Sequence, residues 1–333
     1  MRCLLTGATG FVGGAVARQL LAAGHDVRAL VRDPARAARG GLDATTAATI
    51  DWRVGDVTDK ASIRQAMTGV DAVLHVAGWY KVGVPDGDAY RVNVEGTGHV
   101  LDLMDELGVP RGVYTSTLAV NSNTHGRVVD ESYRYEGPHL SRYDETKALA
   151  HRLAEARIAR GLPLVIVQPG AVYGPGDTSA LGTLFRRLLQ GHLPPLPRVT
   201  AFCWGYIDDI ARGHVLALER GQAGRSYFLA GPVHTLVEAA RLAATIAGRP
   251  RPRWTIPPWV LGAAAGLMRP VEALVRLPPE YTSEGLRVLA GVTYLGRDAR
   301  ARQELGWQAR PLADGLRTTL RAEARQLGIE PAF

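Results

Sequence analysis

The stretch TGATGFVG (residues 6–13) joins a short apolar segment, CLLT (3–6), to a helical pattern that begins near residue 11. Glycine recurs in it at every third position. A tight turn of this composition brings backbone N–H groups and a helix N-terminus against a phosphate, with no side chain in the way. Its place between a strand and a helix predicts a dinucleotide-binding loop, with contacts from Gly7, Thr9, Gly10, Phe11, Val12 and Gly13.

Short apolar segments alternate with helical patterns through the first half of the chain, which is typical of a parallel α/β fold. Strands with unbroken apolar character are buried on both faces of a sheet. The pattern therefore predicts a doubly wound parallel sheet of the Rossmann type, covered by helices. The expected strands are 3–6, 27–31, 52–54, 72–77, 112–116 and 164–168. The expected helices lie near 11–23, 59–69, 88–107 and 142–160.

Regularity falls after residue 170, where prolines cluster. We expect a dinucleotide-binding domain over 1–170 and a smaller C-terminal substrate domain over 171–333, with the chain free to cross back between them. The apolar run IPPWVLGAAAGLM (256–268) is shorter than the about 20 residues that span a bilayer, and it predicts a proline-started helix that could face a substrate cavity. Other helices are expected at 179–190, 207–220, 235–247 and 311–327.

The composition is that of an ordinary globular protein: 333 residues, 46% hydrophobic, 21% charged and a formal net charge of +7. The arginines are scattered among 32 acidic residues, so we expect a solvated basic surface, with neither a nucleic-acid nor a membrane partner. Cys3 and Cys203 form no metal or redox spacing, and no metal site is expected. The first residues enter a strand directly, without a signal-peptide pattern, which favours a cytoplasmic protein.

The end of the second expected strand, VRALVRDPAR (27–36), bears on the choice of cofactor. The acidic residue expected there for the ribose of NAD is replaced by Arg32, and a guanidinium suits the 2′-phosphate of NADP. Asp33 could still reach a ribose, and Arg32 could instead be an exposed residue of an arginine-rich surface. The pattern favours NADP over NAD.

Two further strand ends are expected to meet the same cofactor. GDVTD (55–59) places Asp56 and Val57 after the third strand, where Asp56 could accept a hydrogen bond from the adenine amino group or simply fold a turn. HVAG ends the fourth strand with Ala77 and Gly78, whose small size would let the backbone pass close to the cofactor. His75 alone is interpreted as a packed strand histidine.

The segment SRYDETKALAHR (141–152) places Tyr143 and Lys147 four residues apart on one expected helix, so that they share a face. A cation beside a phenol stabilises the phenolate, which lowers the pKa of the tyrosine and makes it a usable acid or base near neutrality. The fifth strand ends in YTST, and the hydroxyls of Ser116 and Thr117 could hold a substrate oxygen. Lysine is rare in this chain. Of the 39 Lys and Arg residues, three are lysines, at positions 60, 81 and 147.

Together these motifs resemble an extended short-chain dehydrogenase/reductase over nearly the whole chain. The matching segments are TGATGFVG, GDV, HVAG, RVNVEGT (91–97), YTST, YDETK, QPGAVYGPG (168–176), GYIDDIA (205–211) and ARQELGWQARPLADGL (301–316). Such proteins often dimerise through two long helices. The resemblance therefore implies a homodimer through the helices near 88–107 and 141–160.

The same resemblance implies roles for individual residues. Tyr143 would be the catalytic acid/base, and Lys147 would lower its pKa and bind the nicotinamide ribose. Thr117 would hydrogen-bond the substrate oxygen, with Ser116 the less favoured occupant of that position. Asn93 would support the site from a helix. The nicotinamide carboxamide would pass the segment that contains Pro169, Gly170 and Val172.

One departure from the nucleotide-sugar enzymes of this family narrows the substrate. Those enzymes usually carry Arg-Asp-Phe where this chain has Phe202, Cys203 and Trp204, and a diphosphate needs charged donors. The Gln-Pro-Gly and Val-Arg-Asp-Pro segments instead resemble the dihydroflavonol-reductase and 3β-hydroxysteroid-dehydrogenase branch. We therefore expect an uncharged, apolar substrate, in a pocket that could draw on Trp79, Tyr80, Tyr133, Tyr173 and Trp204.

The sequence thus predicts an NADP-dependent oxidoreductase that reduces a ketone or aldehyde of a small molecule, in which Tyr143 supplies the proton and Thr117 holds the oxygen. Two alternatives stay open. The first is a nucleotide-sugar epimerase or dehydratase that keeps NAD tightly bound. The second is a non-catalytic NADP-binding sensor on the same scaffold, since a fold alone does not give a function.

Overall fold

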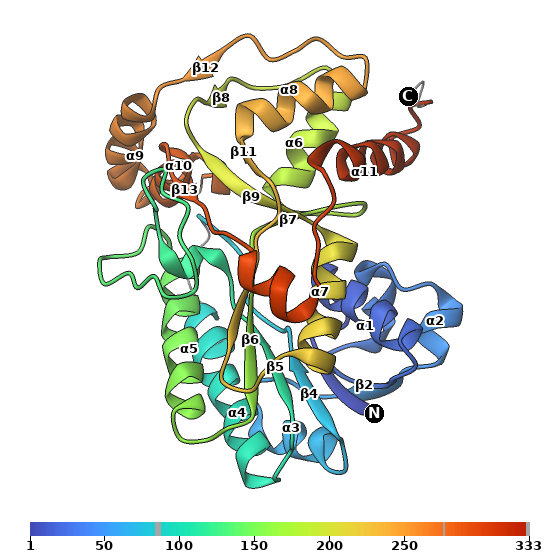
Figure 1. Cartoon of the computed structure of the whole chain (residues 1–333). Coiled ribbons are helices and arrows are strands. Elements are labelled where there is room, and N and C mark those ends of the chain that lie inside the picture. The colour runs from blue at the N-terminus through green and yellow to red at the C-terminus, as the bar shows by residue number, and fades with distance from the viewer. Residues whose placement is uncertain (84–87, 276, 331–333) are drawn as a thin grey trace.

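A parallel sheet forms the lower half of the molecule in Figure 1. The computed structural model describes residues 1–83, 88–275 and 277–330. The strands of this sheet are β1 (Arg2–Thr6), β2 (Asp26–Val31), β3 (Asp51–Val54), β4 (Ala72–His75), β5 (Gly112–Thr115), β6 (Leu164–Pro169) and β10 (Ser226–Leu229). Within the described residues their order is β10-β6-β5-β4-β1-β2-β3, and every neighbouring pair is parallel. The doubly wound Rossmann sheet and the strands expected in the first half are confirmed.

Helices cover both faces of the sheet (Figure 1). Successive side chains of a strand point to opposite faces, so Leu4 and Leu5 of β1, both fully buried, join two different hydrophobic clusters. This double burial explains why the strands are apolar throughout. The cluster around Leu5 includes α1 (Phe11–Ala22) and α7 (Ile207–Arg220), and the cluster around Leu4 includes α3 (Lys60–Met67), α4 (Gly96–Glu106) and α5 (Arg142–Ile158).

The chain returns to the sheet after residue 170. Strand β10 pairs with β6, with Leu229 opposite Pro169, and α7 packs beside α1 on one face of the sheet. Short helical elements complete this half of the molecule. They are the α-helix α2 (Ala44–Ala48), the 3₁₀ turns Pro34–Gly40 and Leu118–Asn121, and the π-helical turn Arg91–Glu95.

The remaining elements form a smaller lobe above the sheet (Figure 1). Strand β9 (Ala201–Tyr206) lies at its centre, parallel to β7 (Ala171–Tyr173) and β13 (Thr293–Tyr294) and antiparallel to β11 (Val233–Thr235). A separate pair joins β8 (Leu196–Pro197) to β12 (Thr255–Ile256). The helices of this lobe are α6 (Ala180–Leu189), α8 (Leu236–Ile246), α9 (Pro258–Glu272), α10 (Ser283–Leu289) and α11 (Leu312–Gln326), with a short turn at Pro279–Tyr281. The turn Ala301–Leu305 packs instead on the sheet half, against α7 and β10.

Local signals start several of these helices where the sequence predicts them. Thr235 and Glu238 form a reciprocal capping box at the start of α8, and α9 begins with proline in its first turn. Within the described ranges, no helix combines the length and the apolar character needed to cross a bilayer.

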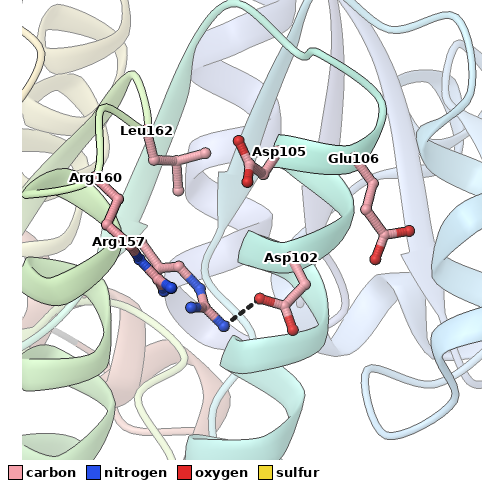
Figure 2. Close-up of a pocket in the computed structure, with 6 residues that line it drawn as sticks. All are labelled: Asp102, Asp105, Glu106, Arg157, Arg160 and Leu162. Atoms are coloured by element: carbon pink, nitrogen blue, oxygen red, sulfur yellow. Dashed lines mark hydrogen bonds and ion pairs between the residues drawn. The ribbon is translucent and has the colours of Figure 1, made fainter.

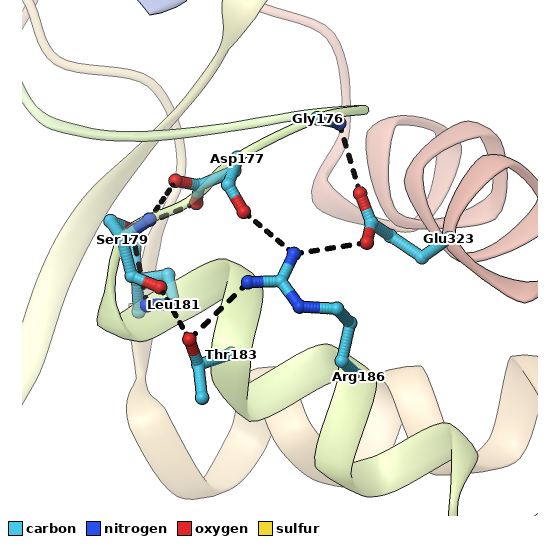
Figure 3. A network of polar contacts seen from close by, with 7 residues as sticks. All are labelled: Gly176, Asp177, Ser179, Leu181, Thr183, Arg186 and Glu323. Carbon is cyan, nitrogen blue, oxygen red and sulfur yellow. Dashed lines mark hydrogen bonds and ion pairs between the residues drawn. The ribbon is translucent and has the colours of Figure 1, made fainter. Parts of the chain in front are cut away.

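A buried carboxylate ties the smaller lobe together (Figure 3). Glu323 of α11 is fully buried, and its oxygens accept from the backbone N–H of Gly176 at 2.9 Å and from Nη1 of Arg186 at 3.0 Å. The same Nη1 of Arg186 donates to the carbonyl of Asp177 at 2.8 Å. Helices α6 and α11 thereby hold the turn that follows β7, the strand expected to pass the nicotinamide.

We expect Glu323→Ala to lower the free energy of unfolding by roughly 3 to 5 kcal/mol, because it leaves the Arg186 guanidinium and the Gly176 N–H without their buried partner. Urea denaturation followed by circular dichroism measures the loss. Asp314→Ala is the matched control on the same helix, since within the described residues the side chain of Asp314 makes an exposed pair with Arg317 and no other ion pair, and its loss should cost less than about 1 kcal/mol. Equal losses in the two variants would contradict the assignment.

Candidate active site

The glycine loop between β1 and α1 is packed too closely for side chains. Gly7 has φ of +81°, and a Cβ on it would lie 2.8 Å from the backbone nitrogen of Ala77, at the end of β4. A Cβ on Gly13 would lie 2.0 Å from the carbonyl oxygen of Gly7. The loop closes with a hydrogen bond from Gly10 N–H to Gly7 O at 2.9 Å. Neighbouring strands and the first turn of α1 therefore fix its conformation.

The N-terminus of α1 is left open by the sequence. Its cap is Gly10, which has no side chain to accept a helix N–H, and the first turn contains no acidic residue. Free N–H groups and the positive end of the helix dipole favour a phosphate at this point. Thr9, Phe11 and Val12 are partly buried around the same turn. The loop thus fits the pyrophosphate of a dinucleotide.

The ends of β2 and β3 hold the residues predicted for the adenosine half. Arg32 is exposed and makes no hydrogen bond or ion pair within the part of the chain that the structure describes. Asp33 instead accepts from Ala35 N–H at 3.0 Å and pairs with Arg36 at 3.3 Å. The carboxylate of Asp33 is therefore already used by the turn, whereas the guanidinium of Arg32 is available.

Asp56 stabilises a turn, which is one of the two roles that the sequence allowed for it. Its Oδ1 accepts from both the N–H and the hydroxyl of Thr58, each at 2.9 Å. Val57, the next residue, is buried and packs against Gly96 at the start of α4. The contact of Asp56 with adenine stays a prediction.

The end of β4 is organised by buried hydroxyls. Thr6 Oγ1 accepts from Ala77 N–H at 3.1 Å and bonds His75 Nδ1 at 2.8 Å, while His75 Nε2 bonds Thr97 Oγ1 at 3.0 Å. Burial, with the nearby charge of Lys147, lowers the pKa of His75 to about 3. The histidine is therefore a neutral, packed residue, as the sequence predicted.

Helix α5 carries the predicted Tyr and Lys pair. Ser141 caps the helix by accepting from Asp144 N–H at 3.1 Å, and Tyr143 and Lys147 follow one turn apart. Lys147 is buried, and its Nζ donates to the carbonyl of Thr115 at 2.7 Å and to the hydroxyl of Tyr114 at 3.2 Å. Burial lowers the pKa of Lys147 to about 7. The ammonium is thus anchored on the end of β5.

The two candidate hydroxyls after β5 point to different partners. Ser116 is buried, and its Oγ bonds His151 Nδ1 at 2.9 Å. Thr117 lies beside the phenol of Tyr143 and favours the phenolate, although burial has the larger effect and raises the pKa of Tyr143 above its ordinary value. Within the described part of the chain, the hydroxyl of Ser116 is thus engaged by the buried His151, and the role of Thr117 as the residue that holds the substrate oxygen stays a prediction.

Asn93 links the loop after β4 to helix α5. Its Oδ1 accepts from Trp79 N–H at 2.7 Å, and its Nδ2 donates to Trp79 O at 3.1 Å and to Thr146 Oγ1 at 3.0 Å. A Cβ on Gly78 would lie 3.3 Å from the same Oδ1. The buried amide therefore holds the segment with Ala77 and Gly78 against the helix that carries Tyr143.

The segment after β6 also leaves no room for side chains. Pro169 is buried, and the next N–H, that of Gly170, donates to Leu229 O at 3.1 Å. A Cβ on Gly170 would lie 2.3 Å from Cys203 O. Val172, in β7, is half-buried. This crossing point joins the sheet to the smaller lobe, and its contact with the nicotinamide stays a prediction.

Three residues lie beside Tyr143, of which Tyr80 was expected to line the pocket, whereas Asp144 and Tyr294 were not predicted as part of the site. Tyr80 stacks edge-on against the Tyr143 ring, with centroids 4.8 Å apart. Asp144 is buried and accepts from the hydroxyl of Tyr294, in β13, at 2.7 Å. Burial raises the pKa of Asp144 to about 7. Asp144 lay within the quoted motif, but nothing in the sequence connects it with a tyrosine 150 residues further on.

The expected aromatic pocket is wrong for two of its members. Tyr173 and Trp204 are fully buried and pack edge-on against each other, with centroids 5.7 Å apart. They belong to the core of the smaller lobe, because β7 and β9 pair and direct these rings inward. Tyr80 is the aromatic residue of that set that contacts Tyr143.

A match to known proteins agrees with this geometry. Residues 3–230 match the model of the NAD dependent epimerase/dehydratase family. The chain belongs to this family. Its members include NAD-dependent reductases, dehydrogenases, epimerases and dehydratases, and the resemblance seen in the sequence is confirmed.

Two relatives and one solved structure illustrate the range of the family. The chain is 32% identical to sterol demethylase protein B of Methylococcus capsulatus, over 92% of this chain and 93% of the relative. It is 31% identical to the 4-hydroxy-2-methyl-3-oxo-4-farnesyl-3,4-dihydroquinoline-1-oxide ketoreductase of Stigmatella aurantiaca, over 93% and 92%. A dTDP-glucose 4,6-dehydratase of Streptomyces venezuelae with NAD bound superposes with a TM-score of 0.77, at 25% identity over 98% and 97% of the two chains.

A hollow of about 200 Å³ lies away from these residues, between α4 and α5 (Figure 2). Asp102 of α4 and Arg157 of α5 form an ion pair at its edge. These are the helices expected to form a homodimer, so the hollow lies on that predicted contact face. The dimer itself stays a prediction.

Gly13→Ala should lower dinucleotide affinity by more than about tenfold, or about 1.4 kcal/mol, because a Cβ cannot fit 2.0 Å from Gly7 O without moving the loop. Isothermal titration with NADPH measures the change. Gly98→Ala is the matched control, since the nearest atom to its Cβ would be 3.8 Å away. Unchanged affinity in Gly13→Ala would contradict the role of the loop.

Asp144 should make stability depend on pH. Because the pKa is raised to about 7 in the fold, the folded protein keeps a proton that the unfolded chain releases, and stability falls as pH rises from about 4 to about 7. Asp144→Asn removes this dependence. As pH rises from about 4 to about 8, the free energy of unfolding of Asp144→Asn should increase by roughly 2 to 4 kcal/mol relative to that of the wild type. Urea denaturation at each pH measures the difference.

Asp105→Asn is the control for that series, because Asp105 is exposed on α4. It should follow the wild type at every pH. If Asp144→Asn also followed the wild type, the carboxyl group of Asp144 would be ionised in the fold. The hydroxyl of Tyr294 would then donate to a carboxylate and not to a neutral carboxyl group.

Proposed function

We propose that the protein is an NADP-dependent reductase of ketones or aldehydes that acts on uncharged, apolar small molecules. The observation that carries this proposal is the cluster at the end of β5, where Thr117 lies beside Tyr143 and the carbonyl of Thr115 anchors Lys147. When bound, the nicotinamide cofactor supplies the hydride. The residues of the chain then have to place the carbonyl group and deliver a proton to its oxygen.

Tyr143 is the proton donor in this scheme. Its phenol transfers the proton to the carbonyl oxygen of the substrate, and Thr117 hydrogen-bonds the same oxygen. Burial alone disfavours the phenolate that is left behind. Lys147, one helical turn away, offers the positive charge that offsets this cost. Asn93 holds the segment after β4 in place, so that the site is assembled before substrate arrives.

Two observations favour an apolar substrate over a nucleotide sugar. Phe202 and Trp204 occupy the strand where the resemblance predicts a diphosphate-binding arginine in nucleotide-sugar enzymes, and Phe202 lies 6.0 Å from the Tyr294 ring. The ketoreductase relative is named for a farnesyl compound and another relative for sterols. The dehydratase structure with NAD has the same fold, and this similarity supports the alternative of a nucleotide-sugar enzyme.

Tyr143→Phe should lower kcat at least about a hundredfold, the usual contribution of a positioned acid, while NADPH affinity stays at the wild-type value. The readout is NADPH oxidation with a panel of aldehydes and ketones on which the wild type is active. Tyr281→Phe, an exposed tyrosine, is the control. Full activity in Tyr143→Phe would overturn the mechanism, and a wild type that binds NADPH but turns over no carbonyl compound would favour the sensor.

Arg32→Ala should weaken NADPH binding by roughly ten- to a hundredfold, the worth of a charge-assisted contact with a phosphate, and leave NADH binding unchanged. Fluorescence titration of the cofactor-stripped protein measures both. Arg225→Ala, an exposed arginine at the start of β10, is the control. Preference for NADH, or NAD that stays with the purified protein, would instead support the epimerase and dehydratase alternative.

A further inference from the structure

Helix α9 and the segments directly before and after it leave large apolar side chains in solvent. Trp254 is 76% exposed, Trp259 75%, Leu267 69% and Leu274 87%. Of the α9 residues, only Leu261 and Ala265 are buried. The predicted proline-started helix is therefore present, but most of its apolar surface faces outward and not into a cavity. Val271, Val275 and Tyr281 extend the same exposed set.

This exposure is unusual for a helix at the surface of a lobe. Single exposed apolar residues are common, but a continuous apolar area marks an interaction site. The only charged residues of α9 are Arg269 and Glu272. Glu272 is occupied by Ser283, whose N–H and hydroxyl donate to it at 2.8 and 2.6 Å. The helix thus presents almost no acidic group to a partner.

Exposed arginines lie in the segment before Trp254, on α8 and on α9. Arg241, Arg251 and Arg253 line an open hollow of about 550 Å³ directly before Trp254 in the chain, and none of the lining residues in the described part of the chain is acidic. Arg198, next to β12, and Arg269 are also exposed. In Figure 1, α9, β12 and the segment that joins β12 to α8 lie at the end of the molecule farthest from the parallel sheet.

We propose that this end of the smaller lobe docks on an anionic lipid bilayer. The docking face consists of the apolar residues Trp254, Trp259, Leu267 and Leu274 and the basic residues Arg198, Arg241, Arg251, Arg253 and Arg269. Tryptophan is favoured at the boundary between lipid and water, leucine enters the acyl region, and arginine pairs with lipid phosphates. This end of the lobe therefore offers all three contacts.

The charges disfavour the other occupants of this face. A second copy docked on the same face would bring two sets of arginines together, with almost no acidic side chain on α9 to offset them. A nucleic acid would account for the arginines but not for Leu267 and Leu274, which are 69% and 87% exposed. Composition alone predicted no membrane partner, because it does not show which apolar residues the fold leaves outside.

The docking face is connected to the candidate site. Ser283, which binds Glu272 of α9, begins helix α10. The next residue, Glu284, accepts from the backbone N–H of Arg142 at 2.8 Å, beside Tyr143. Docking would therefore bring the start of α5 towards the lipid, where an apolar substrate is concentrated. This last consequence rests on the proposed function, whereas lipid binding does not.

Flotation with phosphatidylcholine vesicles, with and without phosphatidylglycerol, tests the proposal on the full chain. The wild type should float with the anionic vesicles, less so at high salt, and its tryptophan emission should shift to the blue. The double variant Trp259→Glu with Leu267→Glu should reduce the vesicle-bound fraction at least tenfold. Val54→Glu, at a residue that is 71% exposed on β3, should leave it unchanged.

The arginines are tested separately. Arg251→Ala with Arg253→Ala should remove the preference for anionic over neutral vesicles, and Arg160→Ala with Arg225→Ala, two exposed arginines of the sheet lobe, should preserve it. NADPH affinity, equal to the wild type in all variants, confirms that each one is folded. A failure of catalysis with intact vesicle binding would leave this inference standing and overturn only the proposed function.

Three results would overturn it. The first is an absence of binding to both kinds of vesicle. The second is binding that the Trp259 and Leu267 substitutions do not change, which would leave only a basic surface that any polyanion attracts. The third is an oligomer, seen by light scattering, that the same substitutions convert to a smaller species without any effect on lipid, which would assign the face to a second copy.

Discussion

The close approach of Gly7 to the end of β4 is the constraint on which the rest of the site depends. Strands β1 and β4 are neighbours in the sheet although about seventy residues separate them, as the paired Thr6 and His75 show. The order of the strands reverses at this point, where α/β proteins bind their ligands. Because no Cβ fits between Gly7 and Ala77, the loop, the open N-terminus of α1 and the segment towards Asn93 are fixed relative to one another.

Buried polar groups form a second level of organisation around this frame. Lys147, Asp144 and Glu323 are all buried, and each has specific hydrogen-bond partners. An interior of low polarity makes each such contact stronger and makes its loss more costly. Near α5 the same burial shifts the pKa of Lys147 and of Asp144 to about 7. Groups with such shifts beside a candidate acid are characteristic of active sites.

Much of this could be predicted because it is local in the sequence. The glycine spacing, the apolar strands and the four-residue separation of Tyr143 and Lys147 depend on neighbours along the chain. The structure places the loop and the strands as expected, whereas the ammonium of Lys147 contacts Thr115 and Tyr114, and its effect on Tyr143 stays a prediction. Strand β10 was missed because its four residues lie among the irregular segments after residue 170. The bond between Asp144 and Tyr294 could not be predicted, since it depends on how the two lobes meet. The exposure of Trp254 and Trp259 likewise depends on packing that periodicity does not reveal.

Hydride transfer from NADPH to a carbonyl carbon can be tested directly by following the transferred hydrogen. Single turnover with NADPH deuterated at the transferable position of C4, and with an apolar ketone or aldehyde, shows by mass spectrometry where the deuterium goes. Carbonyl reduction by hydride transfer predicts deuterium on the carbinol carbon of the product, with one NADP⁺ formed for each alcohol. Product without deuterium, or activity that appears only with nucleotide sugars and without net oxidation of the cofactor, would contradict it.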